Sequence, residues 1–261
     1  MKNLKRWIDL QGAVNVRDLG GLPTTDGGEI RSGRLFRSDN LQGLTPSDVS
    51  VLVDTLKVRH VVDLRSGAEV ALEGPGPLAA VPEVTIHHHT LFAEGGQHTD
   101  VAMDKVLPWQ KRLPEEDAAE LRVTGFYYGY LRDRPDSVLR ALRTMARGDG
   151  ASIVHCAAGK DRTGVLCALA LTVAGATRES IVEDYVATGE RIEGILARLR
   201  SSETYRTDLD TRTADDHMPR AEYLTQFLGV LDTRFGGPLG WLEAHGWTAQ
   251  DAQTLRGRLR D

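Results

Sequence analysis

The residues with the clearest chemical potential are Cys156 and Arg162, six positions apart in the stretch HCAAGKDRTG at 155–164. An apolar, partly β-branched run at 151–154 precedes this stretch, and an apolar run at 165–174 follows it and stops at a glycine. This order predicts a buried strand, a tight loop and a buried helix. The backbone N–H groups of such a loop, together with the helix N-terminus, form a site for a dianionic phosphate.

The polar residues of this loop suit a phosphate ester as substrate. Cys156 is the expected nucleophile, because positive charge and a helix N-terminus lower the pKa of a thiol from its usual value of about 8.5. Attack on phosphorus would give a phosphocysteine and divide one difficult hydrolysis into easier steps. The planar guanidinium of Arg162 matches two phosphate oxygens. With Arg162, the predicted phosphate-binding residues are Ala157, Ala158, Gly159, Lys160 and Asp161.

Three further residues of the stretch have supporting tasks. His155 is expected to brace the loop from behind, and Thr163 to donate its hydroxyl to the Cys156 thiolate. Lys160 adds a second positive charge beside Arg162, which favours substrates that carry more than one phosphate.

The leaving oxygen needs a proton, and two aspartates are candidates for the general acid. Asp161 lies within the loop itself, and no tryptophan of the chain is followed by Pro-Asp, so a separate Trp-Pro-Asp acid loop is missing. Asp63 lies near the end of a predicted strand at 59–64, and the carboxyl ends of parallel strands meet at one edge of a sheet. Asp63 could therefore help or replace Asp161, or instead form a structural network with Arg65 and Glu69.

The stretch HCAAGKDRTG resembles the CX5R signature of the cysteine-dependent protein tyrosine phosphatase superfamily. Its GKDRTG ending resembles the atypical bacterial and fungal branch typified by the mycobacterial tyrosine phosphatase B. NVRDLGG at 15–21, RLFRSD at 34–39 and GWLEAHGW at 240–247 also resemble this branch, as does Asp184-Tyr185. The resemblance implies activity toward phosphotyrosine, phosphoserine or phosphothreonine, and phosphoinositides, and a catalytic role for the loop aspartate. For the arginines and aspartates of the N-terminal motifs we expect internal salt bridges rather than ligand contacts.

The elements around the loop predict an α/β fold of the tyrosine phosphatase type. A capped helix from Thr45, strands at 59–64 and 84–91 and a helix at 137–147 precede the loop. After the loop helix the chain is expected to be helical to its end, with Thr177 and Thr248 as helix caps. These signals predict a mostly parallel central sheet flanked by helices, with a helical C-terminal half.

The chain shows no linker and no repeat, so we expect a single phosphatase domain over 1–261. Residues 93–120 combine glycines and charges with scattered apolar residues, which indicates an insertion. It is predicted to be either a helical lid over the site or a surface excursion packed on the body of the domain.

Composition limits the partners and the compartment. The net charge of −5 argues against a general nucleic-acid binder. The chain has two cysteines, which make no disulfide framework, and Cys167 is expected in the core. No run of about 20 apolar residues predicts membrane insertion, so we expect a cytoplasmic protein, with export without a recognisable signal peptide left open. We expect no cofactor and no metal, because strand alternation places only His87 and His89, and not His88, on a common face.

The preferred function is hydrolysis of phosphotyrosine, extending to phosphoserine or phosphothreonine, through a phosphocysteine. One alternative is a phosphoinositide or inositol phosphate phosphatase with the same mechanism, which the charge of Lys160 favours. The other is an inactive phosphate-binding adaptor, against which the presence of Cys156, Asp161 and Arg162 argues. The expected partner is a phosphoprotein or phosphoinositide substrate, and the sequence does not indicate an oligomeric state.

Overall fold

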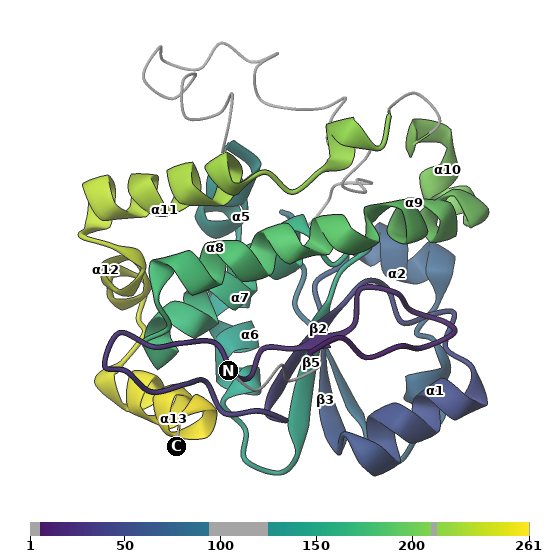
Figure 1. The fold of residues 1–261 in the computed structure, drawn as a ribbon, viewed down its shortest axis with the longest axis horizontal. Coiled ribbons are helices and arrows are strands. Elements are labelled where there is room, and N and C mark those ends of the chain that lie inside the picture. The colour runs from purple at the N-terminus through teal and green to yellow at the C-terminus, as the bar shows by residue number, and fades with distance from the viewer. Residues whose placement is uncertain (1–5, 94–124, 210–212, 261) are drawn as a thin grey trace.

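The structure, a computed structural model, describes residues 6–93, 125–209 and 213–260. A five-stranded sheet with the order β1-β2-β5-β3-β4 runs through it (Figure 1). The strands are β1 (Arg17–Asp18), β2 (Leu35–Ser38), β3 (Val58–Asp63), β4 (Thr85–His88) and β5 (Ala151–His155). β2, β5, β3 and β4 pair in parallel, and β1 pairs antiparallel with β2 at the edge. The mostly parallel sheet predicted from the sequence is confirmed.

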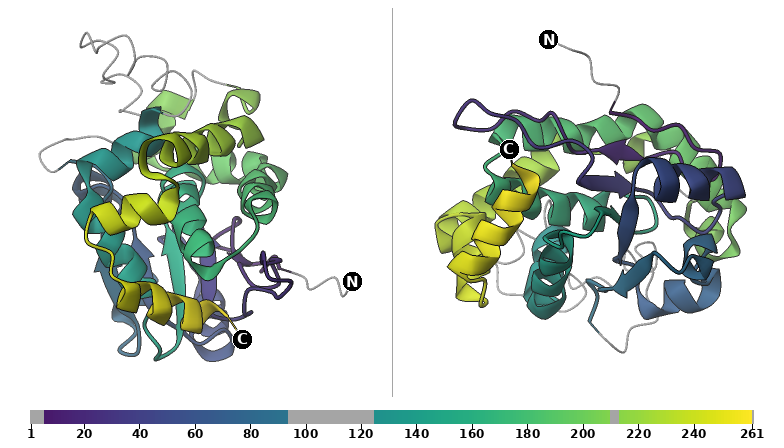
Figure 2. Two further views of the ribbon diagram at one scale, coloured as in Figure 1. Left: turned by 90° about the vertical axis from the view of Figure 1, so that its left-hand side faces the viewer. Right: turned by 90° about the horizontal axis from the view of Figure 1, so that it is seen from below.

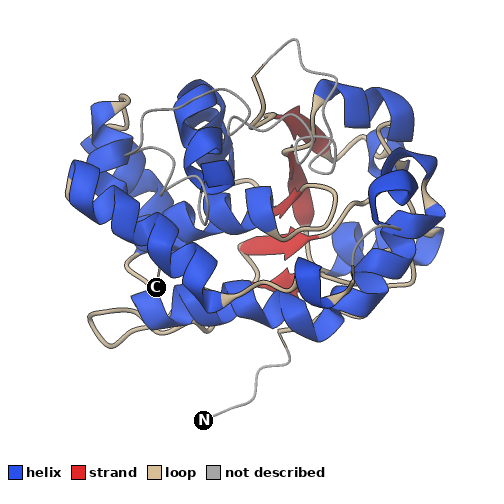
Figure 3. Cartoon of the chain, turned by 90° about the horizontal axis from the view of Figure 1, so that it is seen from above, coloured by secondary structure: helices blue, strands red, loops and turns tan. Residues whose placement is uncertain are grey.

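The two faces of the sheet bury separate cores, because neighbouring residues of a strand point to opposite faces. In β5, Val154 belongs to the larger core and Ile153 to the smaller one. Figure 3 shows the strands between helices on both sides. The larger core contains side chains of α5 (Gly125–Asp133), α6 (Pro135–Met145), α7 (Asp161–Ala174), α8 (Arg178–Ala187), α11 (Ala221–Phe235), α12 (Pro238–Ala244) and α13 (Ala249–Leu259).

The smaller core lies under α1 (Pro46–Ser50) and the π-helical turn that continues it, Val51–Thr55. A 3-10 turn, Pro77–Ala80, also contributes to it. Figure 2 shows that α12 and α13 lie on the side of the molecule opposite to α1 and α2 (Gly67–Glu73). A third cluster joins α9 (Ile192–Ser201) and α10 (Glu203–Leu209) to Ala157 of the predicted phosphate loop.

Helix α7 is central to the architecture, because twelve of its residues are buried. A helix that is apolar on every side has to be surrounded by other elements, and α5, α6, α8, α12 and α13 all contact it. The helix ends as predicted at Gly175, whose φ of 86° lies in the left-handed region that favours glycine. Burial of the hydrophobic run at 165–174 therefore fixes the orientation of α7, and with it the position of the loop that precedes the helix at the sheet edge.

Local signals set several helix ends correctly. Thr45 and Thr248 form capping boxes with Asp48 and Asp251, and Thr177 caps α8. Helix α11 begins at Ala221, a few residues after a 3-10 turn, Asp215–His217.

Two further predictions concern the insertion at 93–120 and the absence of a membrane span. Residues 94–120 of the predicted insertion lie outside the described residues. In the part of the chain that is described, no helix combines the length and apolarity needed to cross a membrane.

Glycine positions in α5 and α7 provide a matched test of this helix geometry. Gly175→Ala should lower the free energy of unfolding by about 1 kcal/mol, because alanine is strained in the left-handed region. Gly129→Ala, inside α5 where a Cβ meets no atom within 4 Å, should raise it by about 0.5 kcal/mol, because glycine weakens a helix interior. Urea unfolding of both variants measures the difference, and equal effects would contradict the assigned end of α7.

Candidate active site

The loop between β5 and α7 has its carbonyl oxygens bonded to the N-terminal part of the chain. The acceptors and their donors are Ala157 O with Asn40 N (2.9 Å), Ala158 O with Asn15 Nδ2 (3.0 Å) and Gly159 O with Arg37 Nη2 (2.7 Å). The N–H and C=O groups of a planar peptide point in roughly opposite directions. Because the loop carbonyls point toward the N-terminal segment, the loop N–H groups point in the opposite direction. An anion site requires N–H groups that are free to point at the ligand in this way.

Gly159 allows this loop to lie directly against β2. Its φ is 68°, and a Cβ at this position would lie 2.2 Å from the carbonyl oxygen of Ser38. Both the backbone conformation and the close approach exclude a side chain. The glycine in the motif is thus required by packing as well as by the turn.

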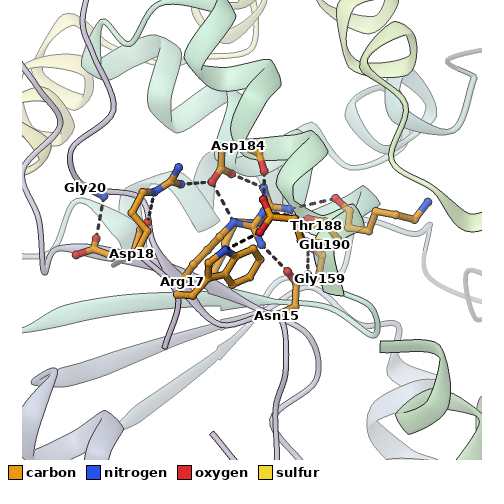
Figure 4. A network of polar contacts seen from close by, with 12 residues as sticks. Asn15, Arg17, Asp18, Gly20, Gly159, Asp184, Thr188 and Glu190 are labelled. Atoms are coloured by element: carbon orange, nitrogen blue, oxygen red, sulfur yellow. Dashed lines mark hydrogen bonds and ion pairs between the residues drawn. The ribbon is translucent and has the colours of Figure 1, made fainter. Parts of the chain in front are cut away.

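A buried ion cluster supports the loop from behind (Figure 4). The carboxylate of Asp184, from α8, pairs with Arg17 Nε at 3.1 Å, with Arg37 Nη1 at 2.7 Å and with Arg6. Burial raises the pKa of Asp184, but the guanidinium groups of Arg17 and Arg37 outweigh it and lower the pKa overall. Because Arg37 also binds Gly159 O, the cluster connects α8, β2 and the loop.

The arginines of the N-terminal motifs form internal salt bridges, as predicted. Their partner is a distant aspartate and not the aspartates next to them in sequence. Arg17 and Arg37 pair with Asp184. Asp18 instead accepts hydrogen bonds from the N–H groups of Gly20 and Gly33. Asp184 was recognised in the sequence only by its similarity to the family, because its partners lie far from it in the chain.

Cys156 follows β5 directly and is fully buried at the sheet edge. Cys167, inside α7, is also buried, and burial raises the pKa of its thiol to about 12. A thiol with this pKa stays protonated at neutral pH. Cys167 therefore belongs to the core, as predicted, and only Cys156 lies beside the loop.

Arg162 is held in a two-point ion pair with Glu69 of α2. Its Nη1 lies 2.7 Å from Oε2 and its Nη2 lies 2.9 Å from Oε1, and both side chains are fully buried. Tyr205 and the backbone of Ser66 donate two further hydrogen bonds to Glu69, and the ring of Phe92 lies 4.9 Å from the guanidinium carbon. Burial raises the pKa of Glu69, but the charge of Arg162 lowers it overall, so Glu69 remains a carboxylate.

Asp161 is the first residue of α7 and is partly exposed, at 23% for its side chain. Its Oδ1 accepts a hydrogen bond from Tyr127 at 2.5 Å and one from the Lys160 ammonium at 3.0 Å. Burial raises the pKa of Asp161, whereas the charge of Lys160 and the hydrogen bond from Tyr127 lower it, and the net direction is down.

Asp63 lies near the same sheet edge, but its carboxylate is occupied. Arg65 donates to it from its backbone N–H at 3.0 Å, from Nε at 3.0 and 3.1 Å and from Nη2 at 2.7 Å. Burial raises the pKa of Asp63, but His155 and Arg65 lower it strongly overall. Arg65 thus occupies both oxygens of Asp63, and neither is left to hold and deliver a proton. The contacts of Asp63 therefore do not support its predicted role as a catalytic acid. The structural network predicted for Asp63, Arg65 and Glu69 is present only as the Asp63–Arg65 pair, because Glu69 binds Arg162 instead.

His155 and Thr163 are the two residues predicted to support the loop, and their contacts differ. Nδ1 of His155 lies 3.1 Å from the carbonyl oxygen of Cys156, so Nδ1 must carry the proton in this contact. Burial lowers the pKa of His155 despite the opposing charge of Asp63. Oγ1 of Thr163 is buried and has no hydrogen-bond partner among the described residues. The predicted bond from Thr163 to the Cys156 thiol is therefore not formed.

The histidine run follows the predicted alternation. His87 contacts His60 at 3.2 Å and stacks with His89, while His88 bonds to the carbonyl oxygen of Arg65 at 2.7 Å. His88 thus points to the side of the sheet that holds the Asp63–Arg65 pair.

Comparison with known proteins agrees with this geometry. A sequence model of the tyrosine phosphatase family matches residues 8–261. The chain belongs to this family. It is 30% identical over 280 residues to the triple specificity protein phosphatase PtpB of Mycobacterium tuberculosis, covering 96% of this chain and 98% of that one. It is 33% identical over 126 residues to a tyrosine-protein phosphatase of Nostoc commune, covering 45% of this chain and 42% of that one.

Among solved structures, TpbA of P. aeruginosa matches 71% of this chain and 84% of its own, at 17% identity and a TM-score of 0.28. The chain is a protein tyrosine phosphatase-type hydrolase with cysteine-dependent chemistry, as HCAAGKDRTG predicts. The phosphoinositide and adaptor alternatives are not favoured by these comparisons.

Sequence reasoning did not find several residues that complete the phosphatase site. Glu69 was considered only as a partner of Asp63 and Arg65, and its pairing with Arg162 was missed, although Ser66 and Glu69 have capping-box spacing directly after a strand that ends at the sheet edge. Asn15 belongs to the family-like motif at 15–21, but its contact with the loop, like that of Tyr127, depends on the tertiary structure.

The Glu69–Arg162 pair leads to a prediction with a matched control. Glu69→Gln removes the charge opposite a buried guanidinium and should lower the free energy of unfolding by about 3 kcal/mol. Inorganic phosphate should raise the melting temperature of this variant more than that of the wild type, because the anion replaces the missing charge. Thermal unfolding with and without phosphate measures both effects.

Glu73→Gln is the control, since Glu73 lies at the end of the same helix and accepts a hydrogen bond from Ser202 instead of from Arg162. Equal responses of the two variants to phosphate would contradict the prediction that Arg162, held by Glu69, binds phosphate.

Proposed function

We propose that this phosphatase hydrolyses phosphotyrosine with Cys156 as nucleophile, Arg162 and the loop N–H groups as phosphate ligands, and Asp161 as general acid and then base. The observation that carries the proposal is the bonding of three successive loop carbonyls away from the loop interior. A backbone cradle with this orientation binds three phosphate oxygens without any side chain and stabilises the charge that develops on them.

In the first step, Sγ of Cys156 attacks phosphorus. The S–P bond forms, the P–O bond to the phenol breaks, and the proton of Asp161 goes to the leaving oxygen. In the second step, a water attacks the phosphocysteine while Asp161, now a carboxylate, takes a proton from it. The S–P bond breaks and inorganic phosphate leaves with the oxygen of that water.

The ion pair with Glu69 supports the role of Arg162. Glu69 binds the outer edge of the guanidinium through both terminal nitrogens and fixes its plane. Fixed donors need little reorganisation when the transferring phosphoryl group changes shape, which is the source of their contribution to catalysis. Asp63 is proposed as a brace through Arg65 and not as the acid.

The roles of Ala157, Ala158, Gly159 and Lys160 follow from their position in the loop. The first three contribute backbone N–H groups, and Lys160 contributes positive charge next to Asp161. For the substrate we propose a phosphoprotein, with phosphoserine and phosphothreonine accepted besides phosphotyrosine. The printed description of the mycobacterial relative as a triple specificity protein phosphatase supports this range.

The test compares the hydrolysis of an aryl phosphate by the wild type and by Cys156→Ser, Asp161→Asn, Arg162→Lys and Asp63→Asn. We expect turnover in the presence of a metal chelator and no turnover by Cys156→Ser. Asp161→Asn should lose about 100-fold or more in kcat, because general acid–base catalysis contributes 10²- to 10⁴-fold. Arg162→Lys should lose as much in kcat/KM, because an ammonium cannot make the two-point contact.

Asp63→Asn should keep the wild-type shape of its pH–rate profile, since Asp63 is not the proton donor in this mechanism. If Asp63→Asn loses the alkaline limb and Asp161→Asn keeps it, the roles are reversed. Phosphotyrosine, phosphoserine and phosphothreonine peptides then define the substrate range, and faster turnover of a phosphoinositide than of all three peptides would contradict a phosphoprotein as the substrate.

A further inference from the structure

Two buried tyrosines connect the loop aspartate to the helical half of the molecule. The hydroxyl of Tyr127, from α5, lies 2.5 Å from Oδ1 of Asp161 and 2.6 Å from the hydroxyl of Tyr185, from α8. Tyr127 is 5% exposed and Tyr185 is 1% exposed. Three different helices thus meet at one hydroxyl group beside the reacting centre.

The direction of these hydrogen bonds follows from the number of protons. Burial and the charge of Asp161 raise the pKa of Tyr127 well above its usual value, and burial raises that of Tyr185 to about 12, so both hydroxyls stay protonated. Tyr127 has one proton, which it gives to the carboxylate of Asp161. In the contact between the two hydroxyls Tyr185 must then be the donor. The order of donation is Tyr185 to Tyr127 to Asp161.

This chain of donors uses only one oxygen of Asp161. Oδ1 accepts from both Tyr127 and Lys160, whereas no described residue bonds to Oδ2. The carboxyl plane is therefore fixed by one oxygen while the other is left to carry a proton.

Packing of Tyr185 explains a second glycine of the motif. A Cβ on Gly164 would lie 2.9 Å from Cδ2 of the Tyr185 ring. The ring also lies edge to face with that of Tyr127, with 6.2 Å between centroids. Gly164 thus gives Tyr185 the space in which its hydroxyl reaches Tyr127.

We propose that Tyr127 and Tyr185 are positioning residues that orient Asp161 through Oδ1, so that Oδ2 holds the proton delivered to the leaving oxygen. This inference rests on the proposed role of Asp161 as general acid. The tyrosines act through Asp161 and do not themselves touch the reacting atoms in the mechanism.

The proposal has a defined consequence for pH dependence. Activity that needs protonated Asp161 is lost as the pH rises through the pKa of this carboxyl. A hydroxyl that donates to the carboxylate stabilises the charged form and lowers that pKa. Removing it therefore moves the alkaline limb of kcat/KM to higher pH. Lys160, Arg162 and, beside Tyr185, Arg37 are the other charged groups that face this cluster, and they are unchanged in the variants below.

The experiment measures pH–rate profiles of Tyr127→Phe and Tyr185→Phe with two substrates. One is a phosphotyrosine peptide, whose leaving group needs a proton. The other is 2,4-dinitrophenyl phosphate, whose leaving group does not. Tyr127→Phe should move the alkaline limb up by about half a unit to one unit, as expected for one hydrogen bond of about 1 kcal/mol. The acidic limb, which reports the nucleophile, should stay in place.

For Tyr127→Phe, kcat should fall on the order of tenfold with the phosphotyrosine peptide and less with the dinitrophenyl ester. Tyr185→Phe should give a smaller shift in the same direction, because it removes only the second donor of the chain. Tyr128→Phe is the matched control, since Tyr128 is on the same helix and its ring packs against Arg234 instead. Its profile should equal that of the wild type.

An unmoved alkaline limb in Tyr127→Phe, or an equal loss with both substrates, would overturn the proposal and leave the tyrosines with a packing role. If Tyr127→Phe fails to fold, the shift in Tyr185→Phe decides the question in the same way. Failure of the proposed function is recognised separately, because Asp161→Asn would then keep wild-type activity on the phosphotyrosine peptide.

Discussion

The orientation of the peptide groups between β5 and α7 is the constraint on which the rest of the site depends. A phosphate cradle made of N–H groups requires carbonyls that point the other way, and a buried carbonyl without a partner is unfavourable. The partners come from the N-terminal segment and β2, with Arg37 contacting Gly159 across 122 positions of sequence. The N-terminal part of the chain is therefore a component of the proposed phosphate site, although it contributes no group to the proposed chemistry.

Buried arginines create a second constraint, because each needs a carboxylate nearby. Arg37 and Arg17 share Asp184, and Arg162 pairs with Glu69. An uncompensated buried charge costs several kcal/mol, so these pairs also fix the elements that supply them. Asp184 places α8 behind the loop, and Glu69 places α2 at the sheet edge. The same pairs keep positive charge close to the expected position of the phosphate.

Helix α7 combines these constraints in one element. Its first residues face the sheet edge, and the rest of the helix is enclosed by hydrophobic side chains of the larger core. Since five other helices contact it, a small movement of its N-terminus would disturb packing throughout the helical half. Two hydroxyl groups tie this same N-terminus to α5 and α8. The proposed chemistry thus sits at a helix end that buried hydrogen bonds and hydrophobic packing hold in place.

The sequence alone determined the elements whose signals are local. The run from 151 to 175, the capping residues Thr45, Thr177 and Thr248 and the motif HCAAGKDRTG all depend on neighbouring residues, and they predicted the parallel sheet, the loop and the family. Only the tertiary structure decided which charged groups meet. Asp161 was the first and Asp63 the second candidate for the acid in sequence, and in the structure Asp63 is occupied by Arg65 while Asp161 presents an oxygen without a described partner. Pairings such as Arg162 with Glu69 depend on how distant elements pack, and no local pattern carries that information.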